Sequence, residues 1–144
     1  MDRREFAALL PVLLGGSALF AEGQGASFPV LESGVFKPSE WKKGSMAGHS
    51  SARYVAGMLK AGNIRLEMHK STIEPGAEHE ALGTHLHSEI WLVRAGTAEL
   101  TTNGVARTMV AGDVGICCAG DKHFIANRSD QPVTYFVVTV GPPE

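Results

Sequence analysis

The sequence predicts a single all-β domain made of short antiparallel strands. Three observations favour this fold class: apolar and polar residues alternate along several segments, turn-forming residues separate these segments, and no segment shows convincing helical periodicity. The 144 residues include 17 glycines and 7 prolines, which is typical of a chain with many turns. A chain of this length suits one hydrophobic core, and many short strands around one core indicate a sandwich or a barrel.

The predicted strands follow one another from residue 63 onwards, and each ends at a turn signal. Between Ile64 and Met68 apolar residues alternate with polar ones, which predicts a half-buried strand. Asn103 and Gly104 form a strong hairpin signal between two later strands. The predicted strands cover residues 63–73, 90–95, 97–102, 105–110, 114–118, 123–127 and 133–140.

Residues 1–26 have the character of a signal peptide. Arg3 and Arg4 precede Phe6 and a short apolar run, after which small residues follow. This arrangement resembles the twin-arginine (Tat) signal, which exports folded proteins. We therefore expect the mature protein to be periplasmic or extracellular. The alternative is an ordinary secretory signal that holds two arginines, and no apolar stretch is long enough to predict a membrane span.

The rest of the chain divides into two parts. Residues 27–62 predict an extended arm followed by an edge strand. Three large apolar residues of the arm are expected to pack onto the barrel: Phe28, Phe36 and Trp41. Residues 63–140 contain the sharper strand patterns and are predicted to form the barrel itself.

Charge and cysteine spacing exclude several function classes. The net charge of −2, the pI near 6.3 and the scattered basic residues argue against nucleic-acid binding, which needs a clustered basic face. Cys117 and Cys118 are adjacent, a spacing that fits neither a zinc site nor a CxxC redox motif. We interpret them as two small apolar residues of a strand.

Three histidines and one glutamate predict a site for a divalent metal. His85, His87 and Glu89 occupy alternate positions just before an apolar strand. Imidazole offers a lone pair, carboxylate offers charge, and alternate residues of a strand project to one side. One strand end supplies only part of a coordination shell, and His123, after a turn signal, is the candidate for a further ligand. Asn127 is expected on the same strand face as His123.

The segment around His123 resembles the second motif of the cupin superfamily, the small jelly-roll barrels. That motif reads Gly, five residues, Pro, any residue, Gly, two residues, His, three residues, Asn. Four positions are occupied as the motif requires: Gly112, Gly120, His123 and Asn127. Cys118 replaces the proline. The resemblance covers about residues 60–140 and implies an antiparallel jelly-roll barrel with a metal inside.

The first cupin motif is matched in part. It reads His, any residue, His, three or four residues, Glu, six residues, Gly, and Glu89 and Gly96 match its end. Counting back from Glu89 places the second histidine at His85 and the first at Gly83. The other register takes His85 and His87 as the pair and leaves one residue before Glu89.

Chain geometry favours the register that counts back to His85. In cupins the histidine pair and the glutamate lie on consecutive strands, and a reversal needs at least two loop residues. His85 then ends one strand, residues 86–88 turn, and Glu89 starts the next strand. In this register His85, Glu89 and His123 form a two-histidine, one-carboxylate set. His87 is then either a fourth ligand or a residue at the rim.

Two more histidines have weaker roles. His79 could fold back to fill the place that Gly83 leaves open, while His69 is interpreted as structural or exposed. Strand alternation places Trp91 on the same face as Glu89, so Trp91 and Asn127 are expected to line the pocket.

The resemblance implies an exported cupin that binds a divalent metal and a small molecule. Iron or manganese is favoured, with zinc, nickel and copper as alternatives. We expect an oxygenase or another metal-dependent oxidoreductase, although no side chain stands out as a catalytic acid or base. The alternative is a non-catalytic cupin that binds a metal or a small ligand, or a cupin that has lost its metal. The resemblance also implies a homodimer.

Overall fold

The computed structural model describes residues 27–144, which form nine β-strands and no helix. The strands are β1 (Lys42–Lys43), β2 (His49–Met58), β3 (Arg65–Ile73), β4 (Ser88–Ala95), β5 (Thr97–Thr102), β6 (Val105–Val110), β7 (Val114–Cys117), β8 (His123–Ala126) and β9 (Val133–Gly141). Strands β3 to β9 agree with the predicted strands to within two residues at each end. The predicted signal peptide lies outside the described residues, and these residues contain no helical segment that could traverse a bilayer.

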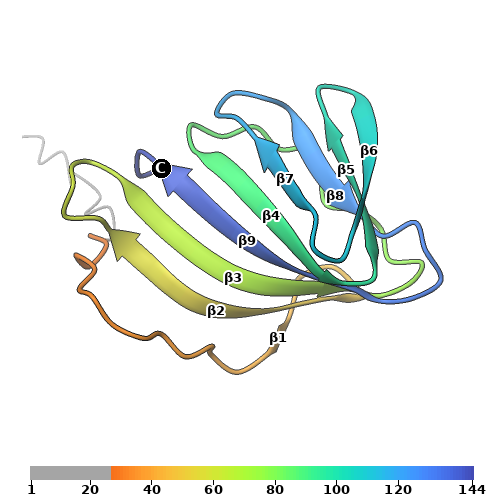
Figure 1. Ribbon diagram of the computed structural model, residues 1–144, viewed down its shortest axis with the longest axis horizontal. Coiled ribbons are helices and arrows are strands. Elements are labelled where there is room, and N and C mark those ends of the chain that lie inside the picture. The colour runs from red at the N-terminus through yellow and green to blue at the C-terminus, as the bar shows by residue number, and fades with distance from the viewer. Residues whose placement is uncertain (1–26) are drawn as a thin grey trace, which may run out of the picture.

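Two antiparallel sheets form a single barrel-like domain, which confirms the predicted fold class (Figure 1). The larger sheet has the order β1-β2-β3-β9-β4-β7, and the smaller has the order β6-β5-β8. Both sheets contribute to one buried core, since apolar residues are removed from water on their facing sides. The core consists of Ile73, Trp91, Val93, Ala98, Leu100, Met109, Cys117, Ile125, Val133, Tyr135 and Val137.

Two glycines fix the turns that connect β4, β5 and β6. Asn103 and Gly104 have φ angles of 48° and 79°, as a two-residue hairpin between β5 and β6 requires. Gly96, with φ of 81°, lies where the chain leaves the larger sheet for the smaller one. A Cβ atom at Gly96 would lie 2.3 Å from the carbonyl oxygen of Pro132, so no other residue fits there without a shift.

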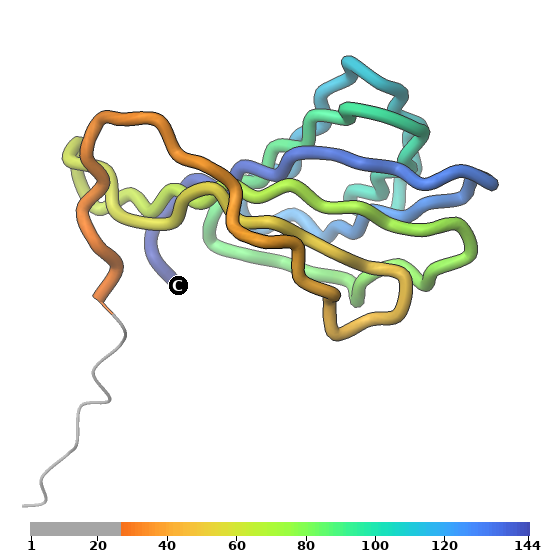
Figure 2. Tube along the Cα trace, turned by 90° about the horizontal axis from the view of Figure 1, so that it is seen from below, coloured from red at the N-terminus to blue at the C-terminus, as the bar shows by residue number. Residues whose placement is uncertain are grey.

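The polar side of β3 faces the interior of the barrel. Glu67 is buried, and His69 and Ser71 line an internal cavity. Part of the other side of β3 is covered by the arm, which runs alongside β2 (Figure 2). Trp41 from this arm lies over Lys70, with 4.8 Å between the ammonium nitrogen and the ring centre. Residues 65–73 therefore form a strand as predicted, but the side that faces the interior is the polar one, so it offers polar groups to a ligand.

The outer side of β4 and β7 carries exposed apolar residues. Leu92 pairs with Val114 in the sheet register, and Ile116 lies two residues further along β7. All three are classed among the exposed large apolar side chains. The predicted homodimer remains a prediction.

Asn127 ties the end of β8 to β3 and to the following loop. Its amide group donates to the carbonyl oxygens of Ile73 and Gln131 at 2.9 and 2.8 Å. Its own oxygen accepts from the backbone nitrogen and the hydroxyl of Ser129 at 2.9 and 2.7 Å. The side chain is buried, so these bonds replace water for every polar atom of the amide.

The adjacent cysteines have different surroundings. Cys117 is buried in the core, whereas Cys118 is exposed. Burial, followed by the nearby negative charges of Asp121 and Glu89, raises the pKa of Cys117 to about 11. The interpretation of Cys117 as a small core residue is thus confirmed, but Cys118 points to solvent.

Replacement of Asn127 by alanine is expected to lower the free energy of unfolding by roughly 2–3 kcal/mol, because buried partners lose their hydrogen bonds. Urea unfolding measures the change, and Asn63→Ala, in an exposed turn, is the control. A loss below about 0.5 kcal/mol, the usual range for neutral surface substitutions, would contradict this structural role.

Near neutral pH a maleimide reagent is expected to modify Cys118 and to spare Cys117 in the folded protein, as mass spectrometry of tryptic peptides will show.

The pKa of Cys117 is raised in the folded protein, so its neutral thiol contributes its full stabilisation at pH values below the ordinary pKa of 9.0. This contribution is lost as the pH rises towards 11, because the unfolded thiol ionises first. The difference in unfolding free energy between wild type and Cys117→Ala should therefore shrink across this window. A difference that stays constant would show that the thiol has an ordinary pKa.

Candidate metal centre

Glu89 is the central residue of the candidate site. It lies near the start of β4 and pairs with Cys117 of β7 on one side and Thr139 of β9 on the other. Its side chain is only 15% exposed. A carboxylate in such a position needs charged or hydrogen-bonding partners to offset the loss of water.

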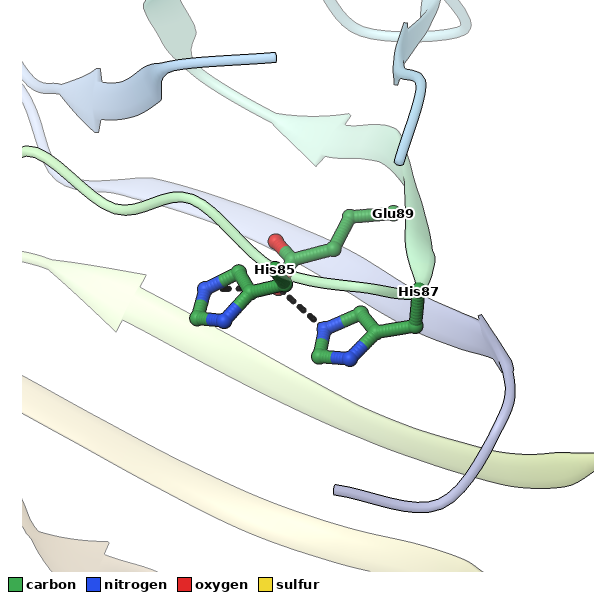
Figure 3. Close-up of side chains that lie close together, drawn as sticks. All are labelled: His85, His87 and Glu89. Atoms are coloured by element: carbon green, nitrogen blue, oxygen red, sulfur yellow. Dashed lines mark hydrogen bonds and ion pairs between the residues drawn. The ribbon is translucent and has the colours of Figure 1, made fainter. Parts of the chain in front are cut away.

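Three histidine side chains surround this carboxylate. The Nε2 atoms of His87, His123 and His85 lie 3.2, 3.5 and 3.8 Å from the nearest Glu89 oxygen. The rings of His85 and His87 stack with centres 4.6 Å apart, and both approach Glu89 (Figure 3). One ligand atom from each of His85, His87 and Glu89 lies within 4.8 Å of the others, so this triad could hold a metal ion. His123 is not part of this triad, but its Nε2 atom lies beside the same Glu89 carboxylate.

Backbone hydrogen bonds hold His123 against the loop that carries His85. His123 forms an isolated bridge with Gly83, through two bonds of 2.9 and 3.0 Å. The carbonyl oxygen of His85 accepts from the nitrogen of Gly120 at 2.8 Å. The Nδ1 atom of His123 lies 3.2 Å from the carbonyl oxygen of Asp121, so its Nε2 atom is the one turned towards Glu89.

Gly83 lies in close contact with the histidines. A Cβ atom at this position would lie 3.2 Å from Nε2 of His85 and 3.6 Å from Nε2 of His123. A side chain at position 83 would therefore point into the site, which agrees with the register that counts back from Glu89 to Gly83. His87 nevertheless reaches Glu89 from the loop, and it comes closer than His85 does.

His79 does not take the place left by Gly83. Its ring stacks on Phe124 with centres 4.0 Å apart, and its Nδ1 atom lies 2.6 Å from the carbonyl oxygen of Glu80. Aromatic stacking thus holds His79 outside the cluster. The alternative in which His79 replaces the missing ligand is wrong.

A cavity of about 190 Å³ adjoins the site. Trp91 lines it as predicted, with its ring 5.5 Å from that of His123. Asn127 does not line it, because its amide is directed to β3 and the following loop. The lining residues are His69, Ser71, Glu80, Ala81, Gly83, His85, Glu89, Trp91, His123, Phe124, Ile125, Tyr135 and Val137.

Sequence reasoning missed several polar residues of this cavity wall. His69 and Ser71 share the interior side of β3 with buried Ile73, and Tyr135 shares the interior side of β9 with buried Val133 and Val137. Their position at every second residue from these buried apolar residues is the signal that could have identified them. Burial raises the pKa of the Tyr135 phenol above its ordinary value, so the phenol stays protonated and can donate a hydrogen bond.

Glu144 is a further group at the site that the sequence did not predict. Its carboxylate contacts Nδ1 of His87 and lies 3.6 Å from Nδ1 of His85. The backbone nitrogen of Leu86 donates to both of its oxygens, at 3.2 and 3.0 Å. The bond from Leu86, and then the charges of the two histidines, lower the pKa of Glu144. No local pattern marks a residue so distant in the sequence.

Comparison with known proteins agrees with this picture. Residues 69–139, which run from β3 to β9, match the family model of the cupin domain. A Cupin 2 conserved barrel domain protein from Salinispora arenicola is 26% identical, with a TM-score of 0.53, over 63% of this chain and 74% of its own. No match was found among curated proteins.

Two further solved structures share the fold. KdgF from Halomonas sp. superposes with a TM-score of 0.62 at 16% identity, over 78% of this chain and 96% of its own. A sugar phosphate isomerase from Silicibacter pomeroyi has a TM-score of 0.56 at 24% identity, over 75% of this chain and 73% of its own. The matched region contains all four candidate ligands. Residues 69–139 of this chain therefore match the cupin domain, and together with the preceding strands they fold as a small barrel like those of known cupin structures.

Proposed function

We propose that this cupin domain binds one divalent metal ion through His85, His87, Glu89 and His123. The convergence of three imidazole Nε2 atoms on one carboxylate is the observation that carries the proposal. This donor set suits iron or manganese, and zinc, nickel and copper also accept imidazole ligands. A redox-active metal held there would supply Lewis-acid and oxidation chemistry. We infer a metal-dependent oxidoreductase, such as an oxygenase, that acts on a small molecule.

The cavity wall supports an uncharged substrate. No lysine or arginine lines the cavity among the described residues, whereas Glu80 and Glu89 both do. The wall thus lacks the basic side chains that usually bind a phosphate group, so the activity named for the Silicibacter pomeroyi protein does not suit it. Ser71 and Tyr135 offer hydroxyl groups to orient a substrate, and Trp91 offers an aromatic face. The volume of about 190 Å³ restricts the substrate to a small compound.

A non-catalytic metal-binding function is the second candidate, and the position of His87 favours it. With His87 the chain offers four protein ligands, which fill the shell of a tetrahedral ion. A six-coordinate ion on the same ligands keeps positions open for substrate. The identity of the bound metal therefore separates the two functions.

The metal site predicts that His87→Ala, His85→Ala and His123→Ala each abolish most metal binding while the fold persists. The loss at His87 should be at least as large as that at His85, because His87 lies closer to Glu89 and is less exposed. Plasma mass spectrometry of purified protein, after loading with iron(II), manganese(II) or zinc(II), gives the stoichiometry.

His79→Ala is the matched control, since His79 lies outside the cluster. Equal metal content in wild type and His123→Ala would refute the site. Iron or manganese with substrate-dependent oxygen uptake supports the oxidoreductase. Tightly held zinc without turnover supports the binding protein instead.

We also propose that the protein is exported by the twin-arginine route and acts in the periplasm or outside the cell. The sequence around Arg3, Arg4 and Phe6 supports this proposal. Export of a folded protein would allow the metal to be loaded in the cytoplasm, away from metals that bind more tightly.

Replacement of Arg3 and Arg4 by lysine is expected to keep the protein in the cytoplasm, because the arginine pair is the feature that the route reads. Cell fractionation with immunoblotting measures the distribution. A double variant that is exported like wild type would indicate an ordinary secretory signal.

A further inference from the structure

Glu144 lies on the opposite side of the histidine pair from Glu89. The Nε2 atoms of His85 and His87 face Glu89, at 3.8 and 3.2 Å. Their Nδ1 atoms face Glu144, which contacts His87 directly and lies 3.6 Å from His85. Each of the two rings therefore has one carboxylate at each nitrogen.

The end of β9 brings Glu144 to this position. Gly141 packs against His87 so closely that a Cβ atom would lie 2.6 Å from Cα and 2.7 Å from Cβ of His87. Residues 142–144 then return to the loop, where the backbone nitrogen of Leu86 donates to both carboxylate oxygens. The carboxylate is thus held between the two histidines by the residue that separates them in the sequence.

A carboxylate that accepts a hydrogen bond from the Nδ1–H group determines what Nε2 can do. With Nδ1 protonated, the neutral ring keeps its lone pair on Nε2, where a metal can bind. A hydrogen-bond partner on the second nitrogen also fixes the orientation of the ring and raises its basicity. His123 has separate partners for Nδ1, the carbonyl oxygen of Asp121 and Sγ of Cys117, each at 3.2 Å.

We propose that Glu144 is a positioning residue that holds His85 and His87 with Nδ1 protonated, so that both present Nε2 to a metal beside Glu89. This role rests on the proposed metal site, and it adds a carboxylate from the end of β9 to that site. Glu144 is not a ligand of the same ion, because it faces the opposite nitrogen of each ring.

The test compares Glu144→Ala and Glu144→Gln with wild type and with Glu40→Ala, which removes an exposed carboxylate of the arm. Zinc affinity is measured by competition with a chelator. Glu144→Ala should weaken binding by about 10- to 100-fold, the usual loss when such a partner is removed. Glu144→Gln should restore most of it, because the amide oxygen still accepts from Nδ1. Glu40→Ala should bind zinc like wild type.

Nitrogen NMR of histidine-labelled, metal-free protein shows which ring nitrogen carries a proton, and it provides a readout that does not depend on metal. Wild type should show protonated Nδ1 on His85, His87 and His123. Glu144→Ala should change His85 and His87 but not His123, which serves as the internal control.

Unchanged ring protonation in Glu144→Ala, or zinc affinity equal to that of wild type, would overturn the role of Glu144. If wild type itself binds no zinc, the proposed metal site fails. The metal-free spectra would still decide whether Glu144 sets the protonation of the two rings.

Discussion

The Glu89 carboxylate is the interaction around which the interior of this barrel is arranged. It lies on β4 in the larger sheet, with little access to water, and it needs partners that compensate for lost hydration. Three imidazoles, from the loop before β4 and from β8, surround it, and on the proposed assignment a metal ion between them offsets its charge. The two sheets therefore meet at this carboxylate through polar contacts, while the apolar core holds them together elsewhere.

The strands could be predicted because each depends on local information. Period-two alternation, hairpin residues and glycines with positive φ act over a few neighbouring positions, so β3 to β9 follow from the sequence almost residue by residue. The candidate ligands are also close in sequence, apart from His123, which a motif with fixed spacing connects to the others. The candidate site was therefore accessible to sequence reasoning.

The residues that escaped prediction depend on long-range packing or on irregular backbone. Glu144 reaches His87 only because β9 passes directly over it at Gly141. Asn127 fails as a pocket residue because β8 ends at Ala126, and alternation says nothing beyond a strand end. The turn geometry invoked for His87 assumed two complete strands, but only Gly83 pairs with β8, and the following loop is free to bring His87 inwards.

Gly83 has a consequence for which residues its position tolerates. A Cβ atom there would lie 3.2 Å from Nε2 of His85 and 3.6 Å from Nε2 of His123, and residue 83 also lines the adjoining cavity. A larger residue would therefore have to displace an imidazole or fill part of the cavity. The smallest residue of the chain thus constrains the spacing of the histidines and the shape of the cavity as firmly as any ligand does.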